Sequence, residues 1–526
     1  MWRCIQGWMR DCLESHPTCR GTITKPFLPT RLIDVGTDDI VPRLVDTKAE
    51  KLQSTPYLTL SYCWGGKHGL TLCESTLETL KAGIPTNQLP RTIQDAVSVT
   101  RKLGFRYLWV DSLCIIQDSD ADWTKEAASI CDVYRNCLLT IAAVGASDAN
   151  QGLFAQRDPL AYLPCWMLRN SAGNDFFLWP NKGGTEFHKV WFSNAPLHQR
   201  GWVVQERVLP RRTLNFGVMV AWECCETLRN EPGFPHNPDV LPTDPETYTL
   251  KRKFLDCAPA NAGLVLSDEH MIRNLRGLWM QILMDYTKAK LTISSDRLIA
   301  ISGIIKDLHE RTLWNNFCGL WAPFMTEELL WAPYLQTIEA RIPYEAPTWS
   351  WMSINTDIWN PASWKPGYDV SVIVDIEVVQ SIRSTLQNTI LQPTEVQVLN
   401  LPGARSVASG TMVMRIRGPI FRLGGISLDH YRRTQYDPYI IGDSLPPKDY
   451  TTQFRPDVAP IKPEPHFFLP IKREKGNNPT LWGLALVRST ALFESAYERI
   501  GLVEHRVRPG DITETGIDNK TTILLV

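Results

Sequence analysis

Long apolar runs are missing from this sequence, and their absence excludes a membrane-spanning helix. No run reaches the roughly 18–20 apolar residues that a bilayer requires. Acidic residues interrupt segment 1–20, which also lacks the apolar stretch of a signal peptide. We therefore expect a cytoplasmic protein without a membrane span. Its 13 cysteines should then be mostly reduced thiols, many of them buried.

Nucleotide-binding motifs and an excess of charge are also missing. Neither G-x-G-x-x-G nor G-x4-G-K-[ST] occurs, so the sequence shows no standard dinucleotide or P-loop site, and we expect no cofactor. The formal net charge is −1, which leaves no global basic excess to attract nucleic acid. A small molecule, a protein partner and a homo-oligomer are the interactions that remain open.

The chain has 526 residues, more than one hydrophobic core usually holds. Changes in pattern predict an N-terminal helix and edge strand (1–55), an α/β core (56–226), a mainly helical region (227–345) and a β-rich C-terminal domain (346–526). The 19 tryptophans are many for this length. They favour an aromatic core over pockets or interfaces.

Segment 57–154 alternates apolar runs of strand length with helical patterns. Runs 57–63, 107–116 and 138–143 are typical of strands. A helix is predicted after each of the first two runs, and Asp120 or Asp122 could cap the second helix. The order β-α-β-α-β predicts an α/β core with a mostly parallel sheet and right-handed crossovers.

Three further predictions concern the segments around this core. Segment 28–35 is expected to form an edge strand that is entered through proline. A single strand is predicted over 213–223, and a pair of helices over 314–331.

Polar residues follow the first two predicted strands of the core. In an open α/β sheet, ligands bind outside the carboxyl ends of the strands. Side chains from these two positions should therefore meet at one edge of the sheet. The candidate site residues there are Tyr62, Trp64, Gly65, Asp111 and Gln117.

Asp111 is unusual because it lies inside a nearly continuous apolar run. It could act as a general base or as a buried acceptor for Tyr62 or Trp64, and we favour the structural role. Cys114 would point to the opposite face of a regular strand. It is a candidate nucleophile, but a buried thiol is favoured, because only His68 in this unit could activate it.

Two later segments add charged candidates. Glu126 follows the second strand and could carry chemistry or pair with Arg135 or Arg200. Segment 200–209 predicts a helical turn that forms either a packed ion-pair network or an anion-binding cluster at the rim of a pocket. Its candidate residues are Arg200, Trp202, Glu206 and Arg207.

The N-terminal helix carries the pattern C-x3-H-x2-C, formed by Cys12, His16 and Cys19. These residue types bind metals, but structural zinc needs four ligands, and no second Cys/His pair follows nearby. We therefore favour packing of the thiols against the next domain and predict no metal site.

Several ordered blocks resemble the fungal heterokaryon incompatibility (HET) domain. Segment 57–65 is similar to its opening Y-x-x-L-S-Y-x-W-G, and segment 200–209 resembles the closing R-G-W-x-x-Q-E-R. The intervening blocks match in order at 89–96, 109–117, 122–126, 134 and 152–154, and the flanking segments 28–35, 295–298 and 347–351 are similar to those of stand-alone members. The resemblance implies a fungal source and a role in self/non-self recognition or programmed cell death.

This family is in turn distantly similar to the TIR and Rossmann-like folds. Some proteins of the TIR fold hydrolyse NAD with a glutamate that follows the third strand. The matching segment here, 145–153, carries Asp148, Asn150 and Gln151 but no glutamate. This departure argues against NAD hydrolysis.

Two hypotheses of function follow. In the first, the protein acts in heterokaryon incompatibility and regulated cell death through recognition and assembly. In the second, the core is an enzyme on a small molecule, either nucleotide-like or an intermediate of fungal secondary metabolism. The sequence does not decide whether the protein is catalytic.

Overall fold

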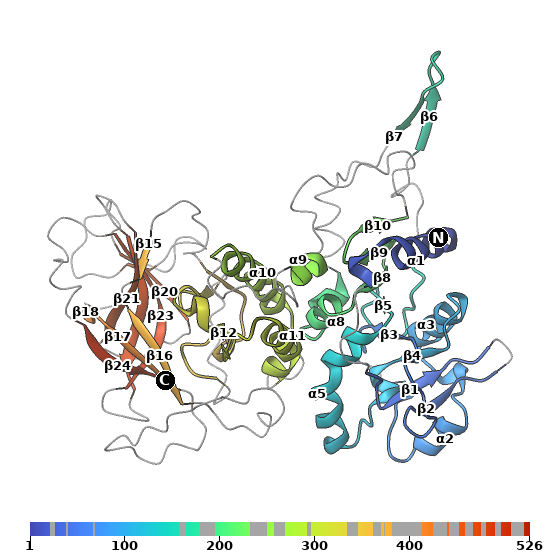
Figure 1. Cartoon of the computed structure of the whole chain (residues 1–526), viewed down its shortest axis with the longest axis horizontal. Coiled ribbons are helices and arrows are strands. Elements are labelled where there is room, and N and C mark those ends of the chain that lie inside the picture. Colours follow the sequence, from blue (N-terminus) through green and yellow to red (C-terminus); the bar gives the residue numbers. More distant parts are fainter. Residues whose placement is uncertain are drawn as a thin grey trace. The chain divides into compact units, whose positions relative to one another are not determined.

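The computed structural model describes residues 1–20, 27–37, 40–66, 69–156, 165–178, 195–231, 250–256, 269–291, 296–333, 346–360, 370–372, 374–380, 413–423, 439–440, 452–457, 466–474, 480–489, 496–506 and 520–526. The chain divides into two compact units (Figure 1). The first comprises Met1–Val265, Ala289–Leu291 and Ile299–Ile304, and the second comprises Leu266–Lys288, Thr292–Leu298 and Ile305–Val526.

An eight-stranded sheet forms the centre of the first unit, in the order β10-β9-β8-β5-β3-β4-β1-β2. Its central strands β4, β3, β5 and β8 are parallel, and both flanks are antiparallel. The sheet is thus mixed rather than mostly parallel, because short turns join the flanking strands and such turns permit only antiparallel pairing. The strands are β1 (Arg31–Asp34), β2 (Arg43–Asp46), β3 (Tyr57–Ser61), β4 (Tyr107–Trp109), β5 (Leu139–Ala142), β8 (Arg212–Phe216), β9 (Val220–Cys224) and β10 (Leu228–Asn230).

Two crossover helices lie on either side of the parallel strands (Figure 1). Helix α3 (Arg91–Lys102) joins β3 to β4, and α5 (Asp120–Asn136) joins β4 to β5. Both were predicted. The cap of α5 was predicted wrongly: the Ser119 hydroxyl accepts the N–H of Asp122 at 3.4 Å.

The other helical segments of the first unit are α1 (Trp2–Ser15), η1 (Thr18–Arg20), α2 (Leu77–Ala82), η2 (Thr86–Gln88), α4 (Asp111–Cys114), η4 (Pro196–Gln199), α8 (Val203–Val208) and α9 (Leu250–Asp256).

The predicted strand over 107–116 is wrong beyond Trp109. The chain turns there into the short helix α4, which begins at Asp111. The Asp111 carboxylate accepts the backbone N–H of Ser112 at 2.7 Å, a local bond that favours a turn over an extended strand. Asp111 and Cys114 therefore lie in one helical turn, and the argument that they occupy opposite faces of a strand does not apply.

Two other strand predictions also need correction. The predicted single strand over 213–223 is the hairpin of β8 and β9, which turns at Gly217, whose N–H donates to the carbonyl of Met219 at 3.2 Å. Strand β1 is not an edge strand, because β2 pairs with it on the outer side.

The second unit combines helices with a ten-stranded sheet (Figure 1). This arrangement confirms the predicted β-rich C-terminal region. The helical segments are α10 (Glu269–Lys288), α11 (Asp296–Thr312, shared with the first unit), η6 (Ala322–Phe324), α12 (Met325–Glu328) and η7 (Trp351–Ser353). The strands of the large sheet are β15 (Val370–Val372), β16 (Asp375–Gln380), β17 (Val413–Gly418), β18 (Phe421–Leu423), β19 (Tyr439–Ile440), β20 (Thr452–Pro456), β21 (His466–Glu474), β22 (Thr480–Arg488), β23 (Ala496–Arg506) and β24 (Thr521–Leu525).

The helical pair predicted over 314–331 is wrong in part. The segment begins with the small hairpin of β11 (Asn316–Phe317) and β12 (Leu320–Trp321), and only its second half is helical. Gly319 at the hairpin turn has φ +87, a conformation that glycine adopts without strain.

Two further small sheets have two strands each. In the second unit β13 (Ala332–Pro333) pairs with β14 (Ile358–Trp359), and in the first unit β6 (Cys165–Arg169) and β7 (Asp175–Leu178) form a separate hairpin.

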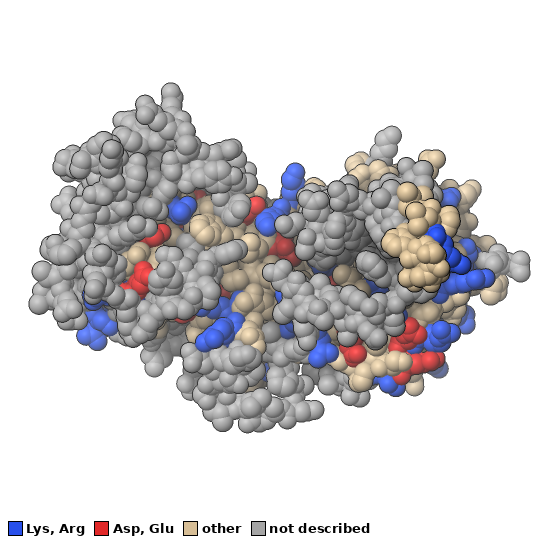
Figure 2. All heavy atoms as spheres, turned by 90° about the horizontal axis from the view of Figure 1, so that it is seen from above, with Lys and Arg blue, Asp and Glu red and all other residues tan. Residues whose placement is uncertain are grey.

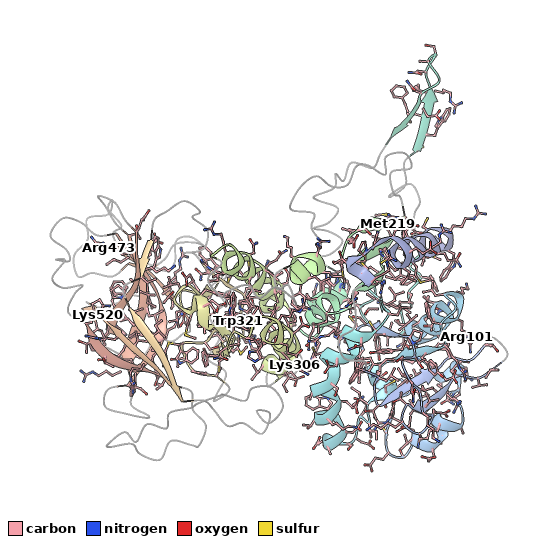
Figure 3. All side chains as sticks on the ribbon, viewed as in Figure 1. Arg101, Met219, Lys306, Trp321, Arg473 and Lys520 are labelled. Carbon is pink, nitrogen blue, oxygen red and sulfur yellow. The ribbon has the colours of Figure 1, made fainter. Side chains whose placement is uncertain are left out.

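Tryptophan fills the interior of both units, which confirms the prediction of an aromatic core. In the second unit, Trp279 and Trp321 meet edge to face with ring centroids 5.7 Å apart, and Figure 3 labels Trp321. Seven tryptophans are among the largest fully buried side chains: Trp109, Trp222, Trp279, Trp321, Trp331, Trp349 and Trp351. On the face drawn in Figure 2, basic and acidic side chains of the described residues lie interspersed.

A buried ion pair joins β23 to the segment after β20 in the second unit. The Arg499 guanidinium donates to both carboxylate oxygens of Asp457, at 2.8 and 3.0 Å. It also donates to the carbonyls of Leu329 and Trp331, and it lies 3.6 Å from the centroid of the Trp331 ring. Arg499 and Asp457 are both buried, so the two opposite charges neutralise each other away from water.

We predict that Arg499→Met destabilises the second unit by about 3–5 kcal/mol, because it removes the guanidinium that pairs with the buried Asp457 carboxylate. Urea unfolding followed by tryptophan fluorescence measures this change. Arg417→Met is the matched control, because Arg417 is exposed on β17 and its replacement should change stability by less than about 0.5 kcal/mol. Equal stabilities of the two variants would contradict the prediction.

Candidate functional site

The carboxyl end of β3 lies where the chain changes direction across the sheet. From β3 the chain crosses to β4 on one side, and from β4 it crosses back to β5 on the other side. Crossovers that diverge in this way leave a crevice outside the ends of the strands. Tyr62 and Trp64 follow β3, and Asp111 follows β4, so the topology brings them together.

Asp111 is bound by the residues that surround this crevice. The indole N–H of Trp64 donates to its carboxylate at 2.8 Å, which confirms one of the two partners expected for it. The Tyr62 hydroxyl donates to the Ser112 hydroxyl, also at 2.8 Å, and its hydrogen bonding to Asp111 lowers the pKa of that carboxyl. Burial raises the pKa of the Asp111 carboxyl, although the Arg200 charge and the Trp64 N–H oppose this effect. Part of the Asp111 residue is still exposed.

Glu206 reaches the same strand end from α8. Its side chain is buried, and its carboxylate accepts a hydrogen bond from the hydroxyl of Ser61, the last residue of β3. Burial raises the pKa of the Glu206 carboxyl and the nearby charge of Asp111 adds to the rise, whereas Arg200 lowers it.

Arg200 connects these groups, because it lies just before α8 and its guanidinium donates to the carbonyl of Tyr62. Burial alone would lower the pKa of this guanidinium, but the charges of Glu206 and Asp111 outweigh it and raise the pKa. The Arg200 cation therefore interacts with two carboxyl groups, those of Asp111 and Glu206, and both have raised pKa values. Carboxyls with raised pKa values hold their protons to a higher pH and can act in acid–base chemistry, and an arginine can bind a carboxylate or phosphate.

Gln117 and Gly65 support the crevice from its edges. The Gln117 amide donates to the carbonyls of Asp111 and Ile115, at 3.2 and 2.9 Å, and so holds the turn of α4. Gly65 has φ +74, and a Cβ there would lie 2.4 Å from the Cβ of Asp148. The close approach that Gly65 permits is thus made by Asp148.

The other predicted site residues lie elsewhere. Cys114 is completely buried, and burial raises the pKa of its thiol to about 12. Glu126 accepts the Thr30 hydroxyl at 2.7 Å and lies 3.2 Å from the Lys125 ammonium. Arg207 faces Glu223 at 3.6 Å. Trp202 is the residue directly before α8, and it is partly buried.

Sequence analysis missed Ser61, Ser112 and Tyr134 as parts of this cluster. The Tyr134 hydroxyl donates to the Leu60 carbonyl at 3.3 Å and also lowers the pKa of Glu206 by hydrogen bonding. Two of the three left a signal: Ser61 is the polar residue at the end of a buried strand, and Ser112 directly follows Asp111.

Several other motif residues fasten the domain internally. Asp122 binds the Arg31 guanidinium through both oxygens, at 2.6 and 2.9 Å, and so ties α5 to β1. The N–H groups of Gly152 and Leu153 donate to Thr92 and Asp95 on α3, at 3.1 and 2.9 Å. Gly152 has φ +82, and a Cβ there would lie 2.6 Å from the Asp95 carboxylate, so glycine is required.

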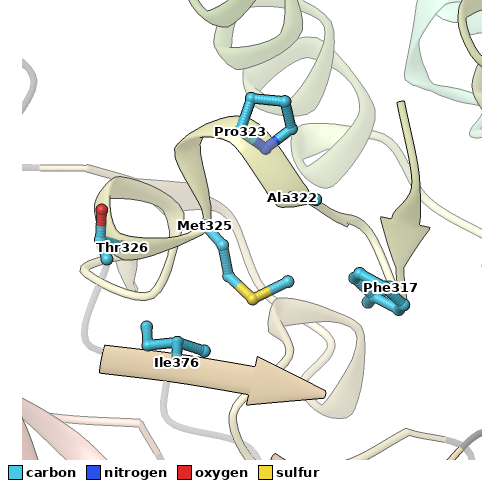
Figure 4. A pocket seen from close by; sticks show the side chains of 6 residues that line it. All are labelled: Phe317, Ala322, Pro323, Met325, Thr326 and Ile376. Carbon is cyan, nitrogen blue, oxygen red and sulfur yellow. The ribbon is translucent and has the colours of Figure 1, made fainter. Parts of the chain in front are cut away.

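A pocket of about 260 Å³ lies in the second unit. Figure 4 shows the Met325 side chain pointing from its helix toward β16, which carries Ile376. The described residues of its lining carry no titratable side chain, so they offer no acid–base chemistry. It is lined by Phe317, Ala322, Pro323, Met325, Thr326 and Ile376.

A comparison with models of protein families identifies a domain within the first unit. The family model described as heterokaryon incompatibility protein (HET) matches residues 57–206. The chain carries a HET domain. The matched region begins with the first residue of β3 and ends at Glu206. Asp111, Arg200 and Glu206 therefore all lie within the HET domain.

Two other comparisons returned no match. The search of curated proteins and the search of solved structures each found nothing that matches the chain. Among the described residues, the helices are all too short or too polar to cross a bilayer.

The raised pKa of Glu206 predicts how the stability of the HET domain depends on pH. The folded protein holds this proton to a higher pH than the unfolded chain, whose glutamates titrate near pH ~4.3. The contribution of Glu206 to stability is thus fully present below that value and is lost as the pH rises through the folded pKa.

Glu206→Gln should remove this part of the pH dependence, so its unfolding temperature should fall less than that of the wild type as the pH rises. Calorimetric unfolding between about pH 4 and pH 8 tests this expectation. Glu78→Gln, at an exposed position on α2, should follow the wild type. Parallel curves for all three proteins would show that the Glu206 pKa is not raised.

Proposed function

We propose that this HET-domain protein acts in fungal heterokaryon incompatibility and regulated cell death, in the cytoplasm, through recognition and assembly. The observation that carries the proposal is the HET match over residues 57–206. The contacts from Ser61 to Glu206 and from Arg200 to Tyr62 support it, because they join the first and last motifs of the domain into one folded unit.

A hairpin within the HET domain supports the assembly step. Strand β6 is exposed along its length, and Trp166, Met167, Leu168 and Phe176 each keep at least half of their surface accessible. An isolated two-stranded hairpin is only marginally stable in water, and exposed apolar patches mark interaction sites. A second copy of this chain is the partner that we propose for the hairpin.

The order β4-β3-β5 supports the more distant likeness to doubly wound folds. Its strands occur in the order 2-1-3, which begins the flavodoxin-like arrangement. We propose that the TIR- and Rossmann-like relationship rests on this part of the sheet. Segment 145–153 still carries no glutamate, so NAD hydrolysis is not proposed.

Assembly through the hairpin predicts a defect for the double variant Trp166→Ser/Phe176→Ser. The purified wild type should form a dimer or larger species in light scattering, and this variant should be a monomer. Expression of the wild type in a filamentous fungus should arrest growth, and the double variant should not. Ser171→Ala, in the turn of the same hairpin, is the matched control and should behave as the wild type. Growth arrest by a monomeric variant would rule out assembly through this hairpin.

The second candidate function is enzymatic, on a small molecule such as a nucleotide-like compound or an intermediate of secondary metabolism. The partly exposed Asp111 near the buried Glu206 favours it, because burial raises the pKa of both carboxyls and the Arg200 charge acts on both. In this function Asp111 is the general base, Glu206 modulates its protonation, and Arg200 binds an anionic group of the substrate.

Asp111→Asn separates the two functions, because the amide retains the shape of the side chain but cannot accept a proton. If the protein is an enzyme, the variant should lose turnover by about 100-fold or more while its unfolding temperature changes little. If the protein acts through assembly, the variant should still arrest growth. Wild type, Asp111→Asn and the exposed control Asp120→Asn are compared with nucleotides and fungal extracts as substrates.

A further inference from the structure

Three potential metal ligands lie at the end of the N-terminal helix. Cys12 is on α1, His16 directly follows that helix, and Cys19 is on η1. A fourth ligand, Cys224, reaches them from the end of β9, 208 residues after His16. All four residues are buried, and their ligand atoms lie within 4.8 Å of one another.

The spacing of these atoms fits tetrahedral coordination. Bond lengths of about 2.3 Å to sulfur and about 2.0 Å to nitrogen place ligand atoms roughly 3.5–3.8 Å apart around zinc. The Nδ1 atom of His16 lies 3.4 Å from the Cys224 sulfur and 4.0 Å from the Cys19 sulfur. Small side-chain movements would therefore close the four ligands on one ion. We propose that Cys12, His16, Cys19 and Cys224 bind a structural zinc ion.

The surroundings of the sulfurs suit thiolates. The Arg212 guanidinium donates to the Cys12 sulfur at 3.2 Å, and the backbone N–H of Thr227 donates to the Cys224 sulfur at 3.3 Å. Metal-bound ligands are held by hydrogen bonds of this kind. Three thiolates and a neutral imidazole around Zn²⁺ leave one net negative charge, which the buried Arg212 balances.

The donor set also selects the metal and its role. Three soft sulfurs and one imidazole in a tetrahedral arrangement favour zinc over the hard cations, which prefer oxygen. Four protein ligands leave no open position, as in structural rather than catalytic sites. The ion would fasten the N-terminal segment to the β8–β9 hairpin, next to the parallel strands of the HET domain.

Cys225 provides a matched control, because it is buried next to Cys224 but lies outside the ligand set. Its thiol donates to the Arg211 carbonyl at 3.5 Å and also hydrogen-bonds Cys19, but the four ligand atoms that lie within 4.8 Å of one another do not include it. Cys225→Ser and Cys224→Ser therefore make the same chemical change at neighbouring positions, and only the second removes a ligand.

The experiment measures the metal content of the full-length protein after exhaustive dialysis, by inductively coupled plasma mass spectrometry. We expect about one zinc per chain for the wild type and Cys225→Ser. Cys224→Ser and His16→Ala should lose at least tenfold in zinc affinity. Cobalt substituted into the wild type should give the intense visible bands of a tetrahedral thiolate site, so the test holds even where a ligand variant fails to fold.

Several results would overturn the proposal. One is a metal-free wild type whose thiols all react with Ellman's reagent after denaturation, since this would indicate simple packing of thiols. Another is a missing pair of thiols, which would indicate a disulfide. Cobalt spectra without sulfur-to-metal charge transfer, or zinc retained equally by Cys224→Ser and Cys225→Ser, would place the metal elsewhere.

Discussion

The HET domain depends on the neutralisation of buried charge at the end of its central strand. Glu206 is buried against β3, and burial of an unpaired carboxylate costs several kcal/mol, about the net stability of a small domain. Arg200 and the Ser61 hydroxyl offset that cost only when α8 returns to this strand end. Folding of segment 200–209 onto the sheet and assembly of the cluster are therefore a single event.

The same cluster explains why structure and function are hard to separate here. A network that holds α8 in place needs one cation between two carboxyls, and an acid–base site needs the same groups. What differs is the exposure of the two residues: Glu206 is buried, whereas part of Asp111 reaches the surface. A small molecule could approach Asp111 more closely than Glu206, so Asp111 is the residue at which the two functions make different demands.

Sequence patterns predicted the regular elements well and the irregular ones poorly. The strands at 57–61 and 139–142 and the helices α3 and α5 follow from apolar periodicity, because they pack on both faces of a sheet. The end of β4 could not be predicted from apolar periodicity, because the apolar run continues through the turn of α4. In that turn, the hydrogen bond from the Ser112 N–H to the Asp111 carboxylate favours the helical conformation. The hairpin of β8 and β9 was missed for the same reason.

The candidate site was predictable where its residues share a topological position. Trp64 and Asp111 follow adjacent parallel strands, so their contact follows from the order of elements. Arg200 and Glu206 could be linked to them only by their motif, because nothing local to residue 200 indicates which strand α8 will cover. Gln117 was expected at the end of a strand that in fact ends at Trp109, and its side chain serves the backbone of α4.

Cys224 shows the limit of spacing arguments most clearly. Ligand patterns are recognised in sequence because short loops hold their members together, as in the helical spacing of Cys12 and His16. The fourth ligand comes from a strand whose position is set by pairing with β8, and β8 is itself set by pairing with β5. The metal site thus exists only once the sheet has formed, and an ion bound there stabilises the sheet and the N-terminal segment together.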